Sequence, residues 1–541
     1  MKEITLRPVP GNCTETVRSI LQSAENGTVI RFEKGIYRFY EQGTHTGIFH
    51  PSNNASGEKK VVFYLSGKKG LTILGNGAEF RFCQRVFPFL AENCENITLE
   101  DFGIDFDFPT YCETAVERVT ENGVVLRCLQ NDLTPGSDPD GALLIQSGNR
   151  QYSNAVKRFF LSNRTNNAVH YLEAPTNCQS RDDLPAPVLV AKAAADGSRV
   201  TLTFCGTSAP AYRAGDQVII GFDENRENDV IFADRVKGLR LDRVHIFRGA
   251  GMGLLAQMCE NVTVQNCCFA AGRHPNETFA LTADELMFVQ CCGKVVIRNN
   301  ILCDSLDDAI NIHGTYTRIR AVVSETEIEA EFCQHEQGCT GFCEADDTLI
   351  VSDGRTGTEK AALHVASAAM ISDRIAVIRL AQPLPPSVAA GDLLENRQRS
   401  PEVEITDNFI KNCPNLRVSS AKPIRIVHNT IATVWCGLVI ADLMQHWYES
   451  GKVYQATVEG NTFCDTTPAG KLNGISISHS KEDACKGYHE NISILNNKFI
   501  LKNGVAVKAD HVRNLEIRGN LVNTANVTEL RHVILKETVG S

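Results

Sequence analysis

Short stretches in which apolar and polar residues alternate recur along the chain in a similar form. Most copies end at asparagine, and Gly, Asn and Asp bound them. A period of two, with β-branched residues at the apolar positions, predicts strands and not helices. The recognisable copies are LTILGN (71–76), ITLEDF (97–102), LRLDRV (239–244), VTVQNC (262–267), VVIRNN (295–300), VEITDN (403–408), IRIVHN (424–429), ATVEGN (456–461), ISILNN (492–497) and LEIRGN (515–520).

Most of these strands follow one another after 21 to 36 residues, an interval that suits one coil of a solenoid. Strands that recur once per coil stack in parallel, about 4.8 Å apart. A leucine-rich repeat would show a tighter period and a leucine consensus, and neither is present. The pattern therefore predicts an all-β chain folded as a right-handed parallel β-helix. Asparagine after the strand suits a tight bend, and stacked coils could align these residues into a hydrogen-bonded ladder.

Two intervals, of 142 and 108 residues, are much longer than a coil and indicate insertions. Both are rich in strand-like segments, so we expect small, barrel-like β modules inserted into turns of the helix. The predicted organisation is N-terminal coils in 1–108, a first module in 109–234, central coils in 235–314, a second module in 315–400 and C-terminal coils in 401–541. Both insertions return beside the same acidic coil, where they could wall a cleft.

Acidic residues interrupt the central coils at positions that a strand disfavours. Asp307 and Asp308 stand in DSLDDAINIHGTY (304–316), and Asp284 stands in LTADELMFVQCCG (281–293). The offset from Asp284 to the pair is 23 or 24 residues, which matches the 23-residue coil between the strands ending at 244 and 267. Stacking of neighbouring coils should therefore bring three carboxylates into one patch. Asp308 can reach this patch only if the strand bends.

Three carboxylates in one patch suit general acid–base catalysis. Like charges at short range raise the pKa of at least one of them, which gives an acid that is still protonated near neutral pH. The remaining carboxylates stay ionised and can activate water, as in inverting glycosidases. A calcium site is the structural alternative, because β-helix carboxylates can bind that ion. The acid–base interpretation is favoured, with no metal expected.

The combination of TADELMF with DDAINIHGTY, on β-helix coils interrupted by β modules, resembles glycoside hydrolase family 110, the α-1,3-galactosidases. The resemblance runs from Gly251 through the C-terminal coils, and the layout is also similar to that of the polygalacturonases. It implies exo-cleavage of terminal α-1,3-linked galactose, from blood group B-type or linear glycans, with inversion and no cofactor. By matched position, Asp307 is expected to be the general acid, and Asp284 and Asp308 to activate water. Met287 departs from the pattern, because many relatives are expected to carry histidine there.

Five further residues are candidates for substrate binding. Alternation places Asn311 and His313, like Asp307 and Ala309, on the outward face of their strand. His313 could bind a sugar or be a turn histidine held by backbone. Arg273 and His274 stand in a loop one coil earlier and could clamp sugar hydroxyls or be solvated. Trp435 could stack on a sugar ring, although a large aromatic residue is more commonly part of a core.

The composition of the chain limits the kinds of molecule that it is expected to bind. The chain has 541 residues, 43% hydrophobic and 22% charged, with a net charge of −10. A negative balance argues against nucleic acid, and no apolar stretch is long enough to span a membrane. An oligosaccharide or glycoconjugate is the expected partner, and the modules could mediate a homodimer. The first thirty residues contain no secretory signal, so we expect a cytoplasmic location, or a secreted or periplasmic one if a leader preceded Met1.

The 20 cysteines lack the regular spacing of a disulfide framework. Many of them stand where a small buried apolar residue belongs, so reduced thiols in the core are expected. Cys333, His335, Cys339 and Cys343 could be viewed as a zinc site, but their spacing fits no standard finger. The thiol interpretation is preferred.

Three alternative functions stay open at this point, because one fold hosts many chemistries. Another β-helix hydrolase, such as a polygalacturonase-like enzyme, would want cationic subsites for its acidic substrate. A polysaccharide lyase would need calcium or a basic residue and would be sensitive to chelators. A non-catalytic carbohydrate-binding β-helix predicts that Asp307→Asn changes nothing. The arrangement of three aspartates favours hydrolysis, and only the resemblance specifies galactose.

Overall fold

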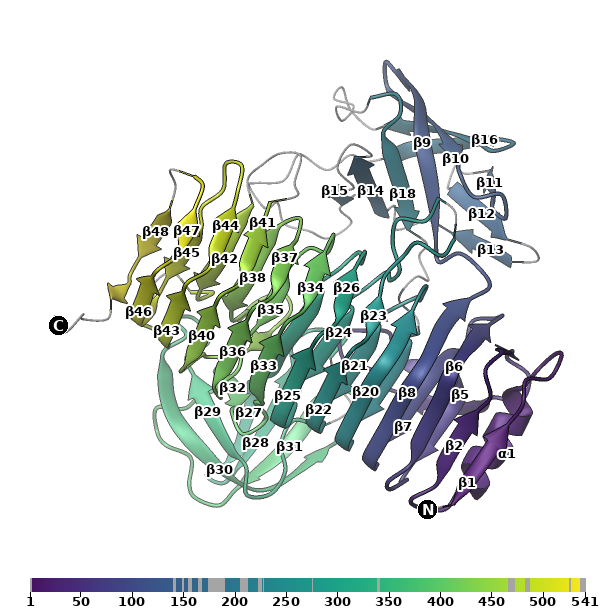
Figure 1. Cartoon of the computed structure of the whole chain (residues 1–541). Coiled ribbons are helices and arrows are strands. Elements are labelled where there is room, and N and C mark those ends of the chain that lie inside the picture. Colours follow the sequence, from purple (N-terminus) through teal and green to yellow (C-terminus); the bar gives the residue numbers. More distant parts are fainter. Residues whose placement is uncertain are drawn as a thin grey trace.

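The computed structural model describes 2–139, 143–147, 150–153, 158–163, 168–173, 190–204, 213–221, 226, 228–274, 276–337, 341–465, 472–481, 487–524 and 527–535. Within these residues the chain forms 49 strands and one α-helix, α1 (Thr14–Ser23). Most strands belong to long sheets that wind along one axis, from the N-terminal helix to the C-terminus (Figure 1). The architecture is therefore all-β.

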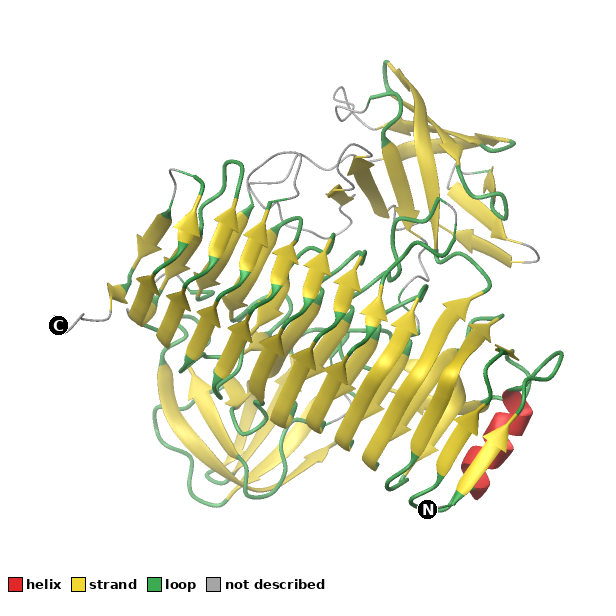
Figure 2. Cartoon of the chain, viewed as in Figure 1, coloured by secondary structure: helices red, strands yellow, loops and turns green. Residues whose placement is uncertain are grey.

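Every recurring strand of the sequence lies in one parallel sheet, in chain order. Leu239, for example, is paired with Ile97 on the coil before it and with Val262 on the coil after it. The predicted parallel β-helix is thus confirmed (Figure 2). These strands are β6 (Thr72–Phe82), β8 (Glu95–Phe106), β20 (Lys237–Ile246), β22 (Glu260–Gln265), β25 (Cys292–Arg298), β33 (Glu402–Thr406), β36 (Ile424–Val427), β40 (Ala456–Glu459), β43 (His489–Leu495) and β46 (Val512–Arg518).

A second parallel sheet runs alongside the first and carries the acidic coils. Each coil contributes one short strand to it, and the apolar side chains of both sheets meet in one continuous core. Its strands are β5 (Gly57–Ser66), β7 (Phe87–Glu92), β19 (Ile231–Asp234), β21 (Leu254–Gln257), β24 (Leu286–Val289), β27 (Ile310–Ser324), β35 (Leu416–Val418), β38 (Cys436–Ala441), β42 (Asn473–Ser478), β45 (Val507–Asp510) and β48 (Thr528–Arg531).

The two ends of the helix are closed differently. At the N-terminal end, α1 packs Val17 and Leu21 into the core and covers the first coil. Terminal elements of this kind shield the open end of a solenoid. At the C-terminal end, Leu521 and Leu535 are 69% and 55% exposed. Among the described residues, apolar side chains are therefore more exposed at this end than at the first coil. The sequence pattern did not predict α1.

Stacked asparagines join the later coils, as predicted. Each amide donates to the next carbonyl oxygen: Asn408 Nδ2 lies 2.9 Å from Asn429 Oδ1, and Asn429 Nδ2 lies 3.0 Å from Asn461 Oδ1. The ladder comprises Asn300, Asn408, Asn429, Asn461, Asn497 and Asn520. The left-handed backbone angle belongs to the residue before each ladder position, such as His428 before Asn429. The ladder asparagine therefore contributes its side chain, and its neighbour makes the bend.

The first inserted segment forms an antiparallel sheet of seven strands in the order β15-β14-β18-β9-β10-β17-β16, beside a three-stranded sheet of β11, β12 and β13. These strands are β9 (Tyr111–Thr120), β10 (Gly123–Cys128), β11 (Thr134–Ser137), β12 (Leu143–Ser147), β13 (Arg150–Ser153), β14 (Arg158–Asn163), β15 (Ala168–Glu173), β16 (Val190–Asp196), β17 (Arg199–Phe204) and β18 (Gln217–Gly221).

The second inserted segment closes on itself. Its antiparallel pairings run β27–β28–β31–β30–β29–β32 and return to β27, which makes a small barrel. The strands after β27 are β28 (Glu327–Phe332), β29 (Thr348–Ser352), β30 (Glu359–Met370), β31 (Ile375–Leu380) and β32 (Leu393–Asn396). The two modules project from different sides of the β-helix (Figure 1).

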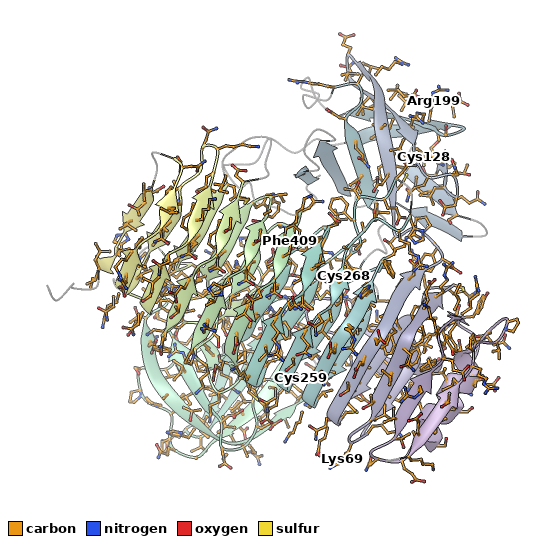
Figure 3. The ribbon with its side chains drawn as sticks, viewed as in Figure 1. Lys69, Cys128, Arg199, Cys259, Cys268 and Phe409 are labelled. Atoms are coloured by element: carbon orange, nitrogen blue, oxygen red, sulfur yellow. The ribbon has the colours of Figure 1, made fainter. Side chains whose placement is uncertain are left out.

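Sixteen cysteines in the described residues are free thiols, and most of them are buried. Cys128 lies in the first module, whereas Cys259 and Cys268 lie in the central coils (Figure 3). This agrees with thiols that fill the core. Cys339 of the considered zinc set lies outside the described residues. No helix in the described part of the chain is long and apolar enough to cross a membrane.

Candidate active site

Asp284, Asp307 and Asp308 come together where two neighbouring coils enter the second parallel sheet. Asp284 lies two residues before β24, and Asp308 likewise lies two residues before β27. The backbone N–H of Glu285 donates to the carbonyl of Asp308 at 2.9 Å, which joins the two coils at this point. One carboxylate oxygen from each aspartate lies within 4.8 Å of the others. The coil spacing predicted this patch.

The three carboxyl groups differ in exposure and in partners. Asp284 and Asp308 are buried, whereas the Asp307 side chain is 33% exposed. Asp308 Oδ1 accepts a hydrogen bond from Asn415 Nδ2 at 2.8 Å, and Asp307 Oδ1 accepts one from the Asp308 backbone N–H at 3.1 Å. Asp284 Oδ1 is buried and has no hydrogen-bond partner. A buried carboxylate oxygen without a partner is costly, which is typical of a site that binds a ligand or water.

Burial and mutual repulsion keep protons in this patch near neutral pH. Burial is the main cause that raises the pKa of Asp308 to about 8, and the charge of Asp307 adds to it. The Arg417 charge and the Asn415 hydrogen bond oppose this rise. Burial, followed by the charges of Asp307 and Asp308, also holds the pKa of Asp284 well above its usual range. A proton is therefore available in the patch at pH 7.

Arg226 supplies a cation to the exposed member of the patch. It lies after the strands of the first module, and its Nη2 is 2.5 Å from Asp307 Oδ2. The Arg226 side chain is 26% exposed, so the pair is only partly open to water. The positive charge of Arg226 also opposes the rise in the pKa of Asp284. The return of the first module thus reaches the acidic coil, as the positions of the insertions suggested.

Glu449 is the centre of a second polar group beside the aspartates. Strand β39 (Glu449–Ser450) pairs antiparallel with β27, opposite Gly314 and Thr315. Arg417 Nε donates to Glu449 Oε2 at 3.0 Å, and His313 Nε2 lies 3.6 Å from Oε1. Burial raises the pKa of Glu449, but the charges of His313 and Arg417 outweigh it, so its pKa lies below the ordinary value.

Two predicted binding residues, Asn311 and His313, belong to this second group. Both face outward from β27, as the alternation predicted, while Ile310 and Ile312 enter the core. Ala309, predicted on the outward face, instead lies in the core, because the chain bends at the aspartate pair before the strand begins. Asn311 Oδ1 and His313 Nε2 are buried and lack hydrogen-bond partners. Such atoms suit contacts with a polar ligand.

The other predicted binding residues contact groups other than the three aspartates. Arg273 is paired with Glu79 and, at 3.2 Å, with Asp105. His274 Nε2 lies 2.9 Å from Asp105 Oδ1. These carboxylates belong to β6 and β8, in the N-terminal coils. Trp435 is half-buried and packs against an apolar cluster where the first module meets the β-helix, formed by Tyr111, Ile219, Phe279, Leu306 and Val434. Substrate contacts by Arg273, His274 and Trp435 stay predictions.

Sequence reasoning missed Arg226, Asn415, Arg417 and Glu449. None of them stands in a recurring strand motif, Arg226 follows the strands of the first module, and Glu449 comes from the two-residue strand β39. Arg417 could have been found, because alternation along LRV (416–418) places it outward, in register with Asn311. The other three carry no periodic signal.

The chain is similar to curated α-1,3-galactosidases along most of its length. It is 26% identical to α-1,3-galactosidase A of Bacteroides thetaiotaomicron, over 96% of this chain and 91% of that protein. It is 25% identical to α-1,3-galactosidase B of the same organism, over 91% and 80%. It is 26% identical to α-1,3-galactosidase A of Akkermansia muciniphila, over 92% and 81%. The resemblance stated from the aspartate motifs is thereby confirmed.

Solved structures similar to this chain include two polygalacturonases. The Erwinia carotovora enzyme matches with a TM-score of 0.41 and 9% identity, over 98% of this chain and 96% of that one. An exopolygalacturonase from Thermotoga maritima matches with a TM-score of 0.40 and 10% identity, over 99% and 92%. No family model matches the chain.

Proposed function

We propose that this protein is an exo-acting α-1,3-galactosidase that hydrolyses terminal α-1,3-linked galactose, from blood group B-type or linear glycans, with inversion. The observation that carries this proposal is the patch of three carboxylates within 4.8 Å, two of which are buried. Neighbouring carboxyl groups of which one is protonated and another is ionised suit hydrolysis of a glycosidic bond. The similarity to α-1,3-galactosidases specifies the sugar and the linkage.

Asp284 and Asp308 are the proposed pair that activates water. Their closest oxygens lie within 4.8 Å, and a water that makes hydrogen bonds of about 2.7 Å to each can bridge such a gap. Asp284 Oδ1 lacks a partner and could accept one of these bonds. The water would lose a proton to the pair as its oxygen bonds to the anomeric carbon.

Asp307 is the proposed general acid, because it is the most exposed of the three and can reach the glycosidic oxygen. In the free protein, Arg226 Nη2 lies 2.5 Å from Asp307 Oδ2, so this contact must open before Asp307 can reach the glycosidic oxygen. We therefore propose that substrate enters between the two side chains and that a proton moves from the Asp284–Asp308 pair to Asp307. Asp307 then gives the proton to the leaving oxygen, and the proton of the attacking water restores the pair.

The Glu449 group is the proposed site for the sugar hydroxyls. It offers charged acceptors and donors within reach of one ring: Glu449, Arg417, His313 and Asn311. A buried site that hydrogen-bonds hydroxyl groups discriminates strongly against sugars that lack them. A polygalacturonase-like hydrolase is the second candidate, and the Arg226 and Arg417 cations are what favours it, because they could bind a sugar carboxylate.

Stereochemistry is the feature that geometry supports least. Inverting enzymes usually hold their two carboxyl groups roughly 6.5–9.5 Å apart, and retaining enzymes about 5–5.5 Å apart. The closest oxygens here lie within 4.8 Å of one another, so inversion rests on the resemblance.

Proton NMR of a Galα1-3Gal digest tests the proposal directly. Early release of β-galactose is the expected result, and early α-galactose would overturn inversion. A parallel digest of oligogalacturonide tests the second candidate. If only that substrate is cleaved, the protein is a polygalacturonase and not a galactosidase. A chelator in both digests should change nothing, whereas loss of activity would indicate a metal at the aspartates.

Asparagine variants test the separate roles. Loss of general acid or base catalysis costs about 10²–10⁴-fold in rate. Asp307→Asn should lose this much on Galα1-3Gal but far less on a nitrophenyl α-galactoside, whose leaving group needs little protonation. Asp284→Asn and Asp308→Asn should lose similar activity on both substrates. If Asp308→Asn instead shows the dependence on the leaving group, Asp308 is the acid.

A further inference from the structure

Three metal-ligating side chains meet at the C-terminal end of the β-helix, away from the aspartate patch along the chain. Asp510 ends β45, His511 follows it, and His532 follows β48 on the next coil. His511 Nδ1 and His532 Nδ1 each lie 2.9 Å from Asp510 Oδ1. One ligand atom from each of the three lies within 4.8 Å of the others. The fold thus brings two imidazoles and a carboxylate to one point.

Stacking explains how residues from two coils reach this point. Val507–Asp510 pairs in parallel with Thr528–Arg531, so the corners that follow these strands are stacked. Both histidines adopt left-handed backbone angles, with φ of 56° for His511 and 48° for His532. They therefore occupy equivalent corners, and their ring centroids are 4.6 Å apart. The arrangement is built by the coil repeat and not by a chance approach of mobile side chains.

The ligand chemistry selects a class of ion. Two imidazole nitrogens with one carboxylate suit zinc and its neighbours, whereas calcium and magnesium prefer oxygen ligands alone. Two ligands about 2.0–2.1 Å from one zinc ion stand about 3 Å apart, which the two nitrogen–oxygen separations already match. His511 is buried and the His532 side chain is 46% exposed, so one side of the point stays open to solvent.

We propose that Asp510, His511 and His532 bind one divalent transition-metal ion of the zinc type, which clamps the last coil onto the coil before it. This end of the helix has exposed apolar residues, such as Leu521 and Leu535. Among the described residues β48 pairs only with β45, and a strand that is paired on one side tends to fray or to pair with other chains. An ion that joins the corners of β45 and β48 would hold the terminal strand in register.

The half-buried thiols of the described residues compete poorly for zinc. Only a thiolate binds the ion well, and burial raises the pKa of the half-buried cysteines. The pKa is raised to about 11 for both Cys83 and Cys333, and upward shifts also hold for Cys268, Cys292 and Cys464. Binding that depends on His532 can therefore be separated from binding to cysteine.

Isothermal titration with zinc chloride tests the site on the full chain after removal of metal by a chelator. Wild type should bind one equivalent more than His532→Ala and Asp510→Asn. His428→Ala is the matched control, because His428 also occupies a left-handed corner beside an aspartate, with its Nδ1 3.9 Å from Asp407 Oδ1, but no third ligand from the described residues joins them. This control should bind like wild type. Equal binding by wild type and His532→Ala would overturn the site.

Two further measurements test, one after the other, which class of ion binds and whether the ion holds the two coils together. Cobalt titrated in place of zinc should give an absorption spectrum without sulfur charge transfer. A spectrum that contains a thiolate band and is the same for wild type and His532→Ala would overturn the assignment. Hydrogen exchange of the β48 amides should slow at least tenfold on addition of zinc, in wild type only. Binding without this protection would refute the clamp. Calcium should produce neither effect.

Discussion

Replacement of Arg226 by glutamine examines the electrostatic core of the proposed site. The Arg226 guanidinium lies 2.5 Å from Asp307 Oδ2, and the two side chains are 26% and 33% exposed. Glutamine keeps a hydrogen-bond donor at this position but removes the positive charge. The variant therefore isolates the effect of charge on the three carboxyl groups.

The expected size follows from Coulomb's law. Two unit charges about 4 Å apart attract by about 4 kcal/mol at an effective dielectric constant near 20, and by about 1 kcal/mol in bulk water. Because this pair is partly exposed, we take about 1–3 kcal/mol, and one pKa unit corresponds to about 1.4 kcal/mol. Loss of the cation disfavours the ionised form of Asp284, whose pKa the Arg226 charge lowers, so this pKa rises. The maximum of kcat/KM against pH should therefore move upward by about 1–2 units.

The assay is kcat/KM for Galα1-3Gal between pH 4 and pH 10. Arg226→Lys keeps the charge and should leave the maximum close to that of wild type. Arg199→Gln removes an arginine from an ion pair of comparable length, 2.7 Å from Glu117, in the outer part of the first module (Figure 3). It should shift nothing. A lower rate for Arg226→Gln with an unmoved maximum, or a maximum moved to lower pH, would refute the electrostatic role.

Three further predictions rest on other groups. Glu449→Gln should lower kcat/KM by about 10–100-fold, mainly through a higher KM, because charged hydrogen bonds to a ligand contribute about 1.5–3 kcal/mol; an unchanged KM would remove Glu449 from the sugar site. Asn429→Ala removes the acceptor of the buried Asn408 amide and the donor to Asn461 Oδ1, which should cost about 2–5 kcal/mol and lower the urea midpoint, whereas Asn520→Ala at the partly exposed end should cost less. The pKa of Asp308 is about 8 in the folded protein and about 3.9 in the unfolded chain. Between these pH values the folded state keeps a proton that the unfolded chain has lost, so the free energy of unfolding falls as pH rises. Asp308→Asn should therefore have a higher melting temperature than wild type at pH 9 and gain less at pH 5; equal gains would contradict the shift.

Alternation and spacing were enough to predict the β-helix and the aspartate patch, since both depend on the coil repeat. The side chains of Val262 and Val264 alternate with Thr263, which fixes the face that enters the core. Asp284 reaches Asp307 and Asp308 because one coil separates them in sequence. The asparagine ladder follows from the same repeat. Each of these features is a property of stacking, which a sequence period reveals.

The features that sequence could not supply come from segments without a period. α1 covers the first coil only once, so no repeat marks it. The pairing of Arg226 with Asp307 spans 81 residues of sequence and an inserted module, and Glu449 approaches β27 from the two-residue strand β39. The bend that places Ala309 in the core is set by packing around the aspartate pair, which outweighs simple alternation. Tertiary packing, not local pattern, decides these positions.

The acidic groups of the site come from the repeating coils, whereas the closest cation comes from an inserted segment, and this division affects the chemistry of the site. The coils supply acids: Asp284, Asp307 and Asp308 would repel one another strongly if all three were ionised. The cation closest to them, Arg226, comes from the return of an insertion. An identical β-helix with a different insertion could therefore keep the aspartates and change both their protonation and the ligand that they accept. On this argument, substrate preference among such proteins should vary with the inserted modules more than with the coils. Exchange of the 109–234 segment between this chain and an α-1,3-galactosidase relative should move the pH maximum along with the module, even though every aspartate stays in place.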